Sequence, residues 1–476
     1  MPSPTCPPSA ATATRVRWWA LALLATCPVV AFAQARPAVS TVVAFAGSTV
    51  GANPIKGPDG ALYGVTAVGN LVTGGLVYRL QADGSKIDTL HQISANDANN
   101  PLGGLLLGSD GLLYGTTRFG PFSELNSAGT VFRIKTDGTG FTVLHKFKTS
   151  TPNAQGDSVN EDGIYPETEL VEGPDGYLYG VTPLGGPNGT GVAYRMSRDG
   201  TSFAVLHAFA AVAVDASGNK VVPVTNADGV GPAGPLLVGA DGFLYGTTPK
   251  GGANASGTIF RLRLDGSGFE VLRAFASLPT GSSSAVPTNA DGSAPSAGLT
   301  DGQDGRVYGV AGLGGSLGYG TLFAFDPVGG VFSVLHNFDG GKGSQPTGEL
   351  LLAQDGKLYG TTAAGGTDDG GKPSVFGTLF SISRDGTGFA NLHNFDSKDG
   401  AYPTGQLVQL NATALIGMTP SGGRCGRGVV FQYSTTGAVV DGITNCGQKK
   451  DGGGATGPAL LLLLAAAAGL RRRLAR

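Results

Sequence analysis

Histidines are the residues of this 476-residue sequence whose type first suggests acid–base or metal chemistry. A neutral imidazole binds metal ions and titrates near neutral pH, so converging histidines form many catalytic and metal centres. All five follow a leucine at the same place of a recurring segment such as FTVLHKF: His91, His145, His207, His336 and His393. In one further copy, Arg273 takes this place. Because a catalytic residue is normally used once, we predict that these histidines are structural and connect neighbouring strands.

Three loops are candidates for binding calcium through oxygen ligands. They are residues 160–163 (NEDG), 226–229 (NADG) and 289–292 (NADG). None has the spacing of a calcium loop, and Asn, Asp and Gly are ordinary turn residues. We therefore predict no cofactor, with calcium as the weaker alternative.

The remaining enzymatic interpretation is a pair of carboxylates that the fold brings together from different repeats. The candidates are isolated acids: Glu124, Glu161, Glu167 and Glu169. The sequence shows no nucleophile triad, phosphate loop or zinc spacing, and no polar cluster that departs from the repeat. We predict no catalytic residue, and an extracellular glycosidase or lyase acting on polysaccharide is the alternative.

The histidines belong to a repeat with three short apolar cores. One core contains Leu-Tyr-Gly, and its tyrosines lie 51 to 66 residues apart: Tyr63, Tyr114, Tyr179, Tyr245, Tyr308 and Tyr359. Another core reads GTVFRI at 129–134, and the third contains the histidine. A degenerate copy of the Leu-Tyr-Gly core lies at 415–419, and VSTVVAF at 39–45 resembles the histidine core, so each core occurs seven times. We expect each tyrosine in the core, with its hydroxyl bonded to a backbone group.

The cores are rich in Val, Ile, Phe, Tyr and Thr, and Asp-Gly turns separate them, as in β-hairpins. Each repeat then holds four antiparallel strands, exemplified by A (141–147), B (102–108), C (112–117) and D (130–134). Seven such units predict an all-β fold, a seven-bladed β-propeller of four-stranded blades over residues 36–446.

The connections between these strands differ in length. The B–C and D–A turns are tight, whereas the A–B and C–D connections vary. Antiparallel order places the tight turns on one face, the trim face, and the other connections on the opposite, variable face. Function generally resides in loops displayed on such a scaffold, so we expect it on the variable face.

Closure of the ring has two candidates, because eight segments compete for seven A positions. Residues 39–45 could supply this strand in the first blade, or residues 438–443 could return after the last strand D. The second path would bring Cys446 beside Cys425 on the variable face.

The two ends of the chain predict export. Residues 1–35 have the form of a secretion signal, and a lipoprotein signal with Cys27 as the modified cysteine is the alternative. At the other end, a Gly-rich linker (447–457) precedes a short hydrophobic helix and basic tail (458–476). Its apolar run of 12 residues rises only about 18 Å as a helix, against a hydrocarbon core of about 30 Å. This tail is either a cleaved sorting signal or a weak membrane anchor.

Removal of the signal leaves two cysteines, Cys425 and Cys446, and in an exported chain these favour a disulfide. The balance of 32 basic and 34 acidic residues gives no concentrated positive surface. We therefore predict no nucleic-acid partner.

The pattern DGLLYGTTRFG…GTVFRI…DGTGFTVLHKF resembles the GloVer tandem repeat of choice-of-anchor surface proteins, over about residues 39–433. The tail, with its glycine cluster and terminal arginines, resembles a GlyGly-CTERM sorting signal. These resemblances imply a cell-surface, outer-envelope or secreted protein whose tail meets a sorting protease and the membrane. They imply no reaction and no ligand. We expect a non-catalytic binding scaffold that presents its variable face to a carbohydrate or a protein.

Overall fold

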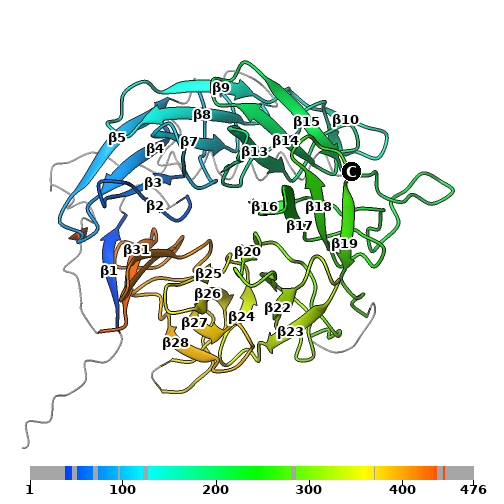
Figure 1. The fold of residues 1–476 in the computed structure, drawn as a ribbon. Coiled ribbons are helices and arrows are strands. Elements are labelled where there is room, and N and C mark those ends of the chain that lie inside the picture. Colours follow the sequence, from blue (N-terminus) through cyan, green and yellow to red (C-terminus); the bar gives the residue numbers. More distant parts are fainter. Residues whose placement is uncertain are drawn as a thin grey trace, which may run out of the picture. The chain divides into compact units, whose positions relative to one another are not determined.

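The computed structural model describes residues 38–45, 51–67, 73–94, 97–121, 127–279, 286–368, 370–436 and 443–444. All regular elements of these residues are β-strands. They form seven antiparallel sheets of four principal strands, set around a common centre (Figure 1). The predicted all-β, seven-bladed propeller is therefore confirmed.

Each of the first six blades follows the chain order B–C–D–A. Blades 1 to 3 consist of β2–β5 (Ile55–Lys56, Leu62–Thr66, Thr73–Leu80, Ile87–Ser94), β6–β9 (Leu106–Leu107, Leu112–Thr117, Thr130–Lys135, Thr142–Lys146) and β12–β15 (Val171–Glu172, Tyr177–Thr182, Val192–Ser197, Phe203–Ala208). Blades 4 to 6 consist of β16–β19 (Ala233–Val238, Phe243–Thr248, Thr258–Arg263, Glu270–Ala274), β20–β23 (Thr300–Asp301, Val307–Ala311, Thr321–Phe325, Phe332–Asn337) and β25–β28 (Leu351–Leu352, Lys357–Ala364, Thr378–Ser383, Ala390–Asn394). Three short strands lie in the connections before strand B of blades 3 and 6: β10 (Thr151–Pro152), β11 (Ser158–Val159) and β24 (Ser344–Pro346).

The last blade joins the two ends of the described chain. Its strands β29 (Val408–Asn411), β30 (Ala414–Thr419) and β31 (Val429–Ser434) are completed by the N-terminal β1 (Ala38–Ala44), which pairs antiparallel with β31. The two-residue β32 (Ile443–Thr444) then pairs parallel with β1.

This closure corrects both alternatives drawn from the sequence. The N-terminal segment does fill the open A position, but in the last blade and not in the first. The physical reason is the tight D–A hairpin, which pairs every strand A with the strand D that precedes it. The only D strand without its own following A is therefore the last one, β31, and β1 completes it.

The glycine of the Leu-Tyr-Gly core is explained by an aromatic ring on the neighbouring strand. Gly115 of β7 lies opposite Phe132 of β8, and a Cβ at Gly115 would come within 2.5 Å of the ring. Gly246 and Phe260 repeat this arrangement, with a distance of 2.4 Å. An aromatic ring that covers a strand glycine compensates for its missing side chain. The two sequence cores therefore recur together because they pack as a unit.

The hydrophobic core lies between blades. One cluster joins Tyr63 and Val77 of blade 1 to Leu113 and Phe132 of blade 2. The corresponding cluster at the closure joins blade 7 and β1 to blade 1, through residues that include Val42, Leu62 and Ile416. Each blade is therefore stable only beside its neighbours, as in other repeat architectures.

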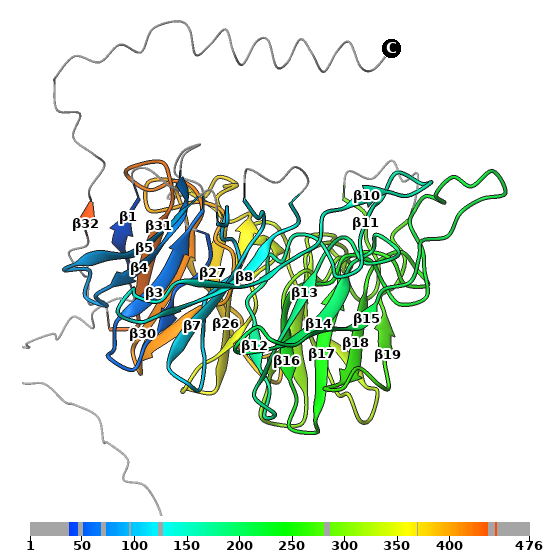
Figure 2. The ribbon, with the colours of Figure 1, turned by 90° about the horizontal axis from the view of Figure 1, so that it is seen from above.

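The loops divide between the two faces as the sequence predicts. Seen at right angles to the ring axis, the tight hairpins lie on one side and the long connections, with β10 and β11, on the other (Figure 2). Within each blade, strand B thus runs from the variable face toward the trim face.

Several predictions concern residues outside the described ranges. They are the secretion signal 1–35, the linker 447–457, the tail 458–476 and Cys446, so the Cys425–Cys446 disulfide stays a prediction. Within the described ranges, no helix has the length and apolar character needed to cross a membrane.

Candidate functional site

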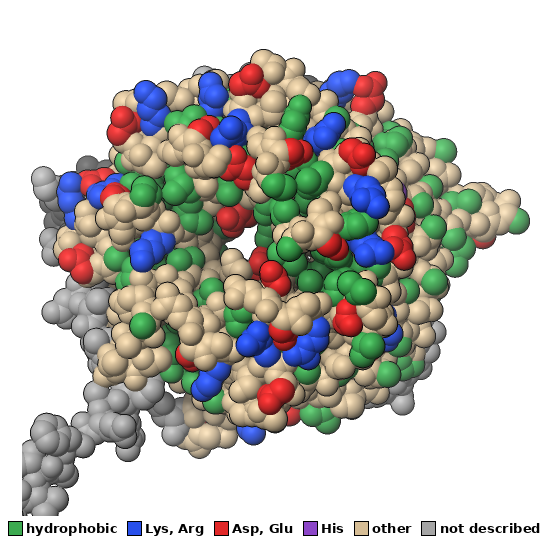
Figure 3. All heavy atoms as spheres, viewed as in Figure 1, with side chains coloured by type: hydrophobic (Ala, Val, Ile, Leu, Met, Phe, Trp, Pro, Cys, Tyr) green, Lys and Arg blue, Asp and Glu red, His purple; other side chains and the backbone are tan. Residues whose placement is uncertain are grey.

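A cavity of about 250 Å³ lies at the centre of the ring. It is lined by residues of all seven strands B or of the segments that lead into them. Figure 3 shows the opening at the centre of the ring, with acidic side chains at its margin. We call this space the central channel.

One position of each blade contributes to a single level of the channel, which we call the inner ring. It lies ten residues before the tyrosine of Leu-Tyr-Gly, or before Ile416 in the last blade. In blade order the inner ring consists of Asn53, Gly104, Glu169, Pro235, Gly298, Glu349 and Gln406. The position after it is leucine in six of the seven blades, whereas the inner-ring position itself is Gly, Pro, an amide or an acid. The expectation that no polar cluster departs from the repeat is therefore wrong.

Glu349 belongs to a chain of polar contacts along one side of the inner ring. The Gln406 side-chain amide donates to Glu349 Oε1 at 2.9 Å and to the Leu350 carbonyl at 3.2 Å. Asn53 Nδ2 in turn donates to the Gln406 carbonyl. The Glu349 carboxylate occupies the space left by Gly298, where an added Cβ would lie 2.5 Å from Oε2.

Glu169 reaches the channel from blade 3 in the same way. Its Oε2 would lie 2.6 Å from a Cβ at Gly104, the inner-ring residue of the preceding blade. Two residues earlier, Glu167 also lines the channel and forms an ion pair with Arg118 at 3.0 Å. Glu167 is thus nearer the variable face, and Glu169 lies deeper.

Both deep carboxyls are poor acids in this environment. Burial raises the pKa of Glu169 to about 7. Burial, and after it the negative charge of Glu169, raises the pKa of Glu349 well above its usual value of 4.5. Both side chains retain some accessible surface, but they face a narrow channel and not bulk water, so their charges are weakly solvated. At neutral pH, Glu169 is therefore near the midpoint of its titration, and the raised pKa of Glu349 favours its protonated form.

Glu169→Gln should raise the unfolding temperature at pH 8 by clearly more than it does at pH 5. The Glu169 carboxyl has a usual pKa of 4.5 and a folded-state pKa of about 7, so stability falls as pH rises through this window. Glutamine removes that loss. Thermal unfolding at both pH values, with Glu161→Gln as a surface control, measures the effect. An equal shift at the two pH values would show that the carboxyl titrates normally.

The four acids proposed from the sequence lie in different parts of the protein. Glu124 lies outside the described residues. Glu161 is exposed and contacts Lys148 on the variable face, away from the channel lining. Glu167 and Glu169 do line the channel. Sequence reasoning missed Glu349, although aligning the residue ten before each tyrosine would have shown it as a second acid in a varying column.

The histidines of strand A contact the next blade. Four of the five rings stack face to face on the first phenylalanine of the following strand A, with centroids 3.6 to 4.2 Å apart: His91–Phe141, His145–Phe203, His207–Phe269 and His336–Phe389. The fifth, His393, has Nε2 at 2.6 Å from Asp399 Oδ2. Arg273, which replaces histidine, lies over Phe332 at 4.5 Å. These contacts bridge neighbouring blades and support the structural interpretation.

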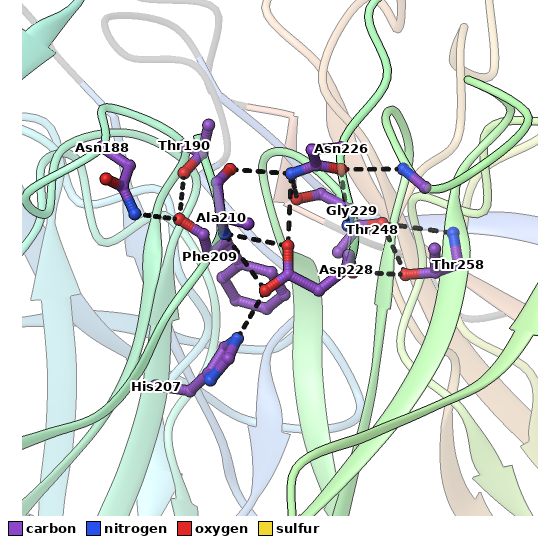
Figure 4. A network of polar contacts seen from close by, with 11 residues as sticks. Asn188, Thr190, His207, Phe209, Ala210, Asn226, Asp228, Gly229, Thr248 and Thr258 are labelled. Carbon is purple, nitrogen blue, oxygen red and sulfur yellow. Dashed lines mark hydrogen bonds and ion pairs between the residues drawn. The ribbon is translucent and has the colours of Figure 1, made fainter. Parts of the chain in front are cut away.

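The loops proposed for calcium are occupied by the protein's own donors (Figure 4). His207 Nε2 lies 2.8 Å from Asp228 Oδ2, and the Ala210 N–H donates to Asp228 Oδ1 at 2.8 Å. Asn226 donates to the carbonyls of Ala210 and Gly229. The 160–163 and 289–292 loops repeat this arrangement with His145 and Arg273. Among the described residues, no group of three or more His, Cys, Asp and Glu is placed to hold a metal.

His207→Ala should lower stability by about 1–3 kcal/mol, because the buried Asp228 loses a charge-assisted partner. His207→Phe keeps the stacked ring but not the hydrogen bond, and should recover part of the loss. Urea unfolding measures both, and ligand binding per folded molecule should be unchanged. Loss of binding by a folded His207→Ala protein would place histidine in the functional site.

The tyrosine hydroxyls bond to aspartate side chains, and the backbone partner that we expected is present for Tyr179 and Tyr308, which also donate to the Leu264 and Arg384 carbonyls at 3.3 Å. Tyr114 donates to Asp110 Oδ2 at 2.7 Å, and Asp110 Oδ1 accepts the Leu112 N–H. The other five tyrosines contact the aspartate four residues earlier in the same way. Gly111, at φ +79°, makes the turn that brings Asp110 back over the strand. The Asp-Gly pair therefore both forms the hairpin and anchors the tyrosine.

Comparison of the sequence with protein families gives one result. The Gloeobacter/Verrucomicrobia repeat matches residues 29–222 and 286–376, more than half of the chain. The chain belongs to this repeat family. The family expected from the GloVer-like motif is thereby confirmed, while the anchoring and sorting details stay predictions. No curated protein matches the sequence.

Several solved structures resemble this chain at low sequence identity. An oligogalacturonate lyase from Vibrio parahaemolyticus is 11% identical, with 84% of this chain and 97% of that chain covered and a TM-score of 0.49. A GH74 xyloglucanase from Xanthomonas campestris is 16% identical, with coverages of 80% and 52% and a TM-score of 0.45. A chain of a nidogen/laminin complex is 15% identical, with coverages of 70% and 94% and a TM-score of 0.39. These values support no transfer of function from any of the three proteins to this member of the repeat family.

Proposed function

We propose that this protein is an exported, non-catalytic binding propeller that recognises a carbohydrate at the variable-face mouth of the central channel. One observation carries the proposal. Side chains that depart from the repeat gather in the inner ring, whereas the repeated His, Tyr and Asp side chains are engaged in holding strands and blades together. A scaffold repeats what folding requires, so departures from the repeat mark what function requires.

The chemistry of the mouth suits a hydroxyl-rich ligand. Ser296, Thr347 and Thr404 line the channel together with the amides of Asn53 and Gln406. Hydroxyl and amide groups both donate and accept hydrogen bonds, as sugar hydroxyls do. The volume of about 250 Å³ is below the usual 300 Å³ or more of a small-molecule site. The channel therefore admits a chain end or a single group, and not the middle of a polymer.

A glycan array with a simultaneous product readout tests this function. The wild-type protein should bind a subset of glycans and release no product. Glu349→Gln should change the affinity for those glycans, while Glu161→Gln, on the same face but outside the channel, should not. Binding that is unaffected by Glu349→Gln would place the recognition site elsewhere.

An extracellular glycosidase or lyase is the second candidate, favoured by one specific observation. Glu169 and Glu349 line the same channel, and burial raises the pKa of both carboxyls, as burial does for carboxyls that act as general acids. If the array shows product release that Glu349→Gln abolishes, the protein is an enzyme of this kind.

Export is the other part of the proposal, with the tail acting as a sorting signal. Mass spectrometry of surface or secreted material should find an N-terminus near Arg36 and a C-terminus near residues 452–454. Without reduction, the peptide that contains Cys425 should be linked to the one that contains Cys446. An intact cytoplasmic chain, or a lipid on Cys27, would contradict the assignment.

A further inference from the structure

We propose that the central channel selects a ligand that carries a primary ammonium group, so that it binds an amino sugar in preference to the N-acetylated sugar. This inference rests on the proposed function and names the ligand class of the same site. It follows from which hydrogen-bonding groups of the channel already have partners and which do not.

The amide donors of the inner ring are already used within the protein. Gln406 Nε2 donates hydrogen bonds to Glu349 Oε1 and the Leu350 carbonyl, and Asn53 Nδ2 donates to the Gln406 carbonyl. Among the described residues that line the channel, none is Lys, Arg or His. The channel thus has no positive charge of its own.

The groups left over are acceptors or carry a hydroxyl. Glu169 has no hydrogen-bond partner among the described residues, although it lines the channel. Asn53 Oδ1, Thr168 Oγ1 and Thr347 Oγ1 are buried and also lack partners there. Glu169 and these oxygens therefore have acceptor capacity that no donor among the described residues uses, an arrangement that a native structure rarely leaves unmet.

An alkylammonium supplies what is missing. It brings three N–H donors and one positive charge in a compact group, and a charge-assisted hydrogen bond to a carboxylate is about twice as strong as a neutral one. An acetamide has one N–H, no charge and greater bulk. The channel volume of about 250 Å³ favours the smaller group. A cation beside two carboxyls also favours their ionised forms, so binding near neutral pH should release protons.

Isothermal titration of the full propeller with glucosamine oligosaccharides and with their N-acetylated counterparts of equal length tests the inference. At pH 6.5, the wild-type protein should bind the amino form at least about tenfold more tightly. Titrations in two buffers of different ionisation enthalpy should show net proton release. The double variant Glu169→Gln/Glu349→Gln should lose both the preference and the proton release, and the surface control Glu161→Gln should keep both.

The alternative outcomes separate this inference from the proposed function. Equal affinity for the two sugars, with binding weakened in the double variant, would support the carbohydrate site but refute the preference for an ammonium group. A preference that survives in the double variant would also refute it. Binding of calcium chloride, and of neither sugar, would show an inorganic cation site and overturn the inference; the glycan array would then decide the proposed function by itself.

Discussion

Gly298→Leu should abolish ligand binding while the propeller remains folded. Gly298 belongs to the inner ring, and an added Cβ would meet Glu349 Oε2 at 2.5 Å and Pro235 Cγ at 3.0 Å. The nearest atom is the end of a flexible side chain, so the backbone can stay in place while the leucine fills the channel and displaces the carboxyl. We expect at least about a hundredfold loss of affinity, since a charged hydrogen bond and the space for the ligand are both removed.

The matched control for this change is Gly341→Leu. Gly341 lies in an exposed turn between β23 and β24, where an added Cβ would meet only Asp339 Oδ1, at 3.8 Å. Binding titrations and unfolding curves of the two variants separate a blocked channel from a damaged fold. Wild-type affinity in a folded Gly298→Leu protein would remove the channel from the proposed function.

Val42→Asp should open the ring and destabilise the protein by about 4 kcal/mol or more, the range expected for burying an unpaired charge. Val42 of β1 has no exposed surface and packs in the cluster that joins blade 7 to blade 1. Closure of the ring depends on this strand, because β1 pairs with β31 and supplies strand A of the last blade. Val328→Asp makes the same chemical change at a side chain that is 89% exposed, and should be nearly neutral.

Thermal and urea unfolding of both variants measure this effect. The Val42→Asp protein should also become sensitive to proteases at low temperature, because the last blade loses its strand A. An unfolding midpoint equal to that of the wild type would mean that β1 is dispensable for closure.

The architecture was predictable because every blade repeats the same local choices. The Asp-Gly turn between strands B and C, the strand-forming residues and the glycine–aromatic pair agree with one another in the first six copies, so a single repeat suffices to define the blade. The position of β1 was not predicted, because it depends on which strand D lacks a partner once the ring closes. The sequence of residues 38–44 does not indicate which strand D they pair with. The pairing follows from the tight D–A hairpins of the other blades.

The site was less predictable for a related reason. Glu169 could be named from the sequence, but its partner Glu349 lies 180 residues further along the chain, and only the ring brings both to one channel. A polar side chain in strand B also resembles an ordinary substitution in a variable repeat. The histidines were given less weight than their chemistry suggested because they recur, and their stacking on the next blade agrees with a structural role that stays a prediction.

A crystal structure of the protein with a glycan selected on the array would show directly whether the central channel is the binding site. We expect the ligand to enter from the variable face, with one of its groups within hydrogen-bonding distance of Glu349 or Glu169. A ligand bound on the outer loops or on the trim face, with only water in the central channel, would contradict it.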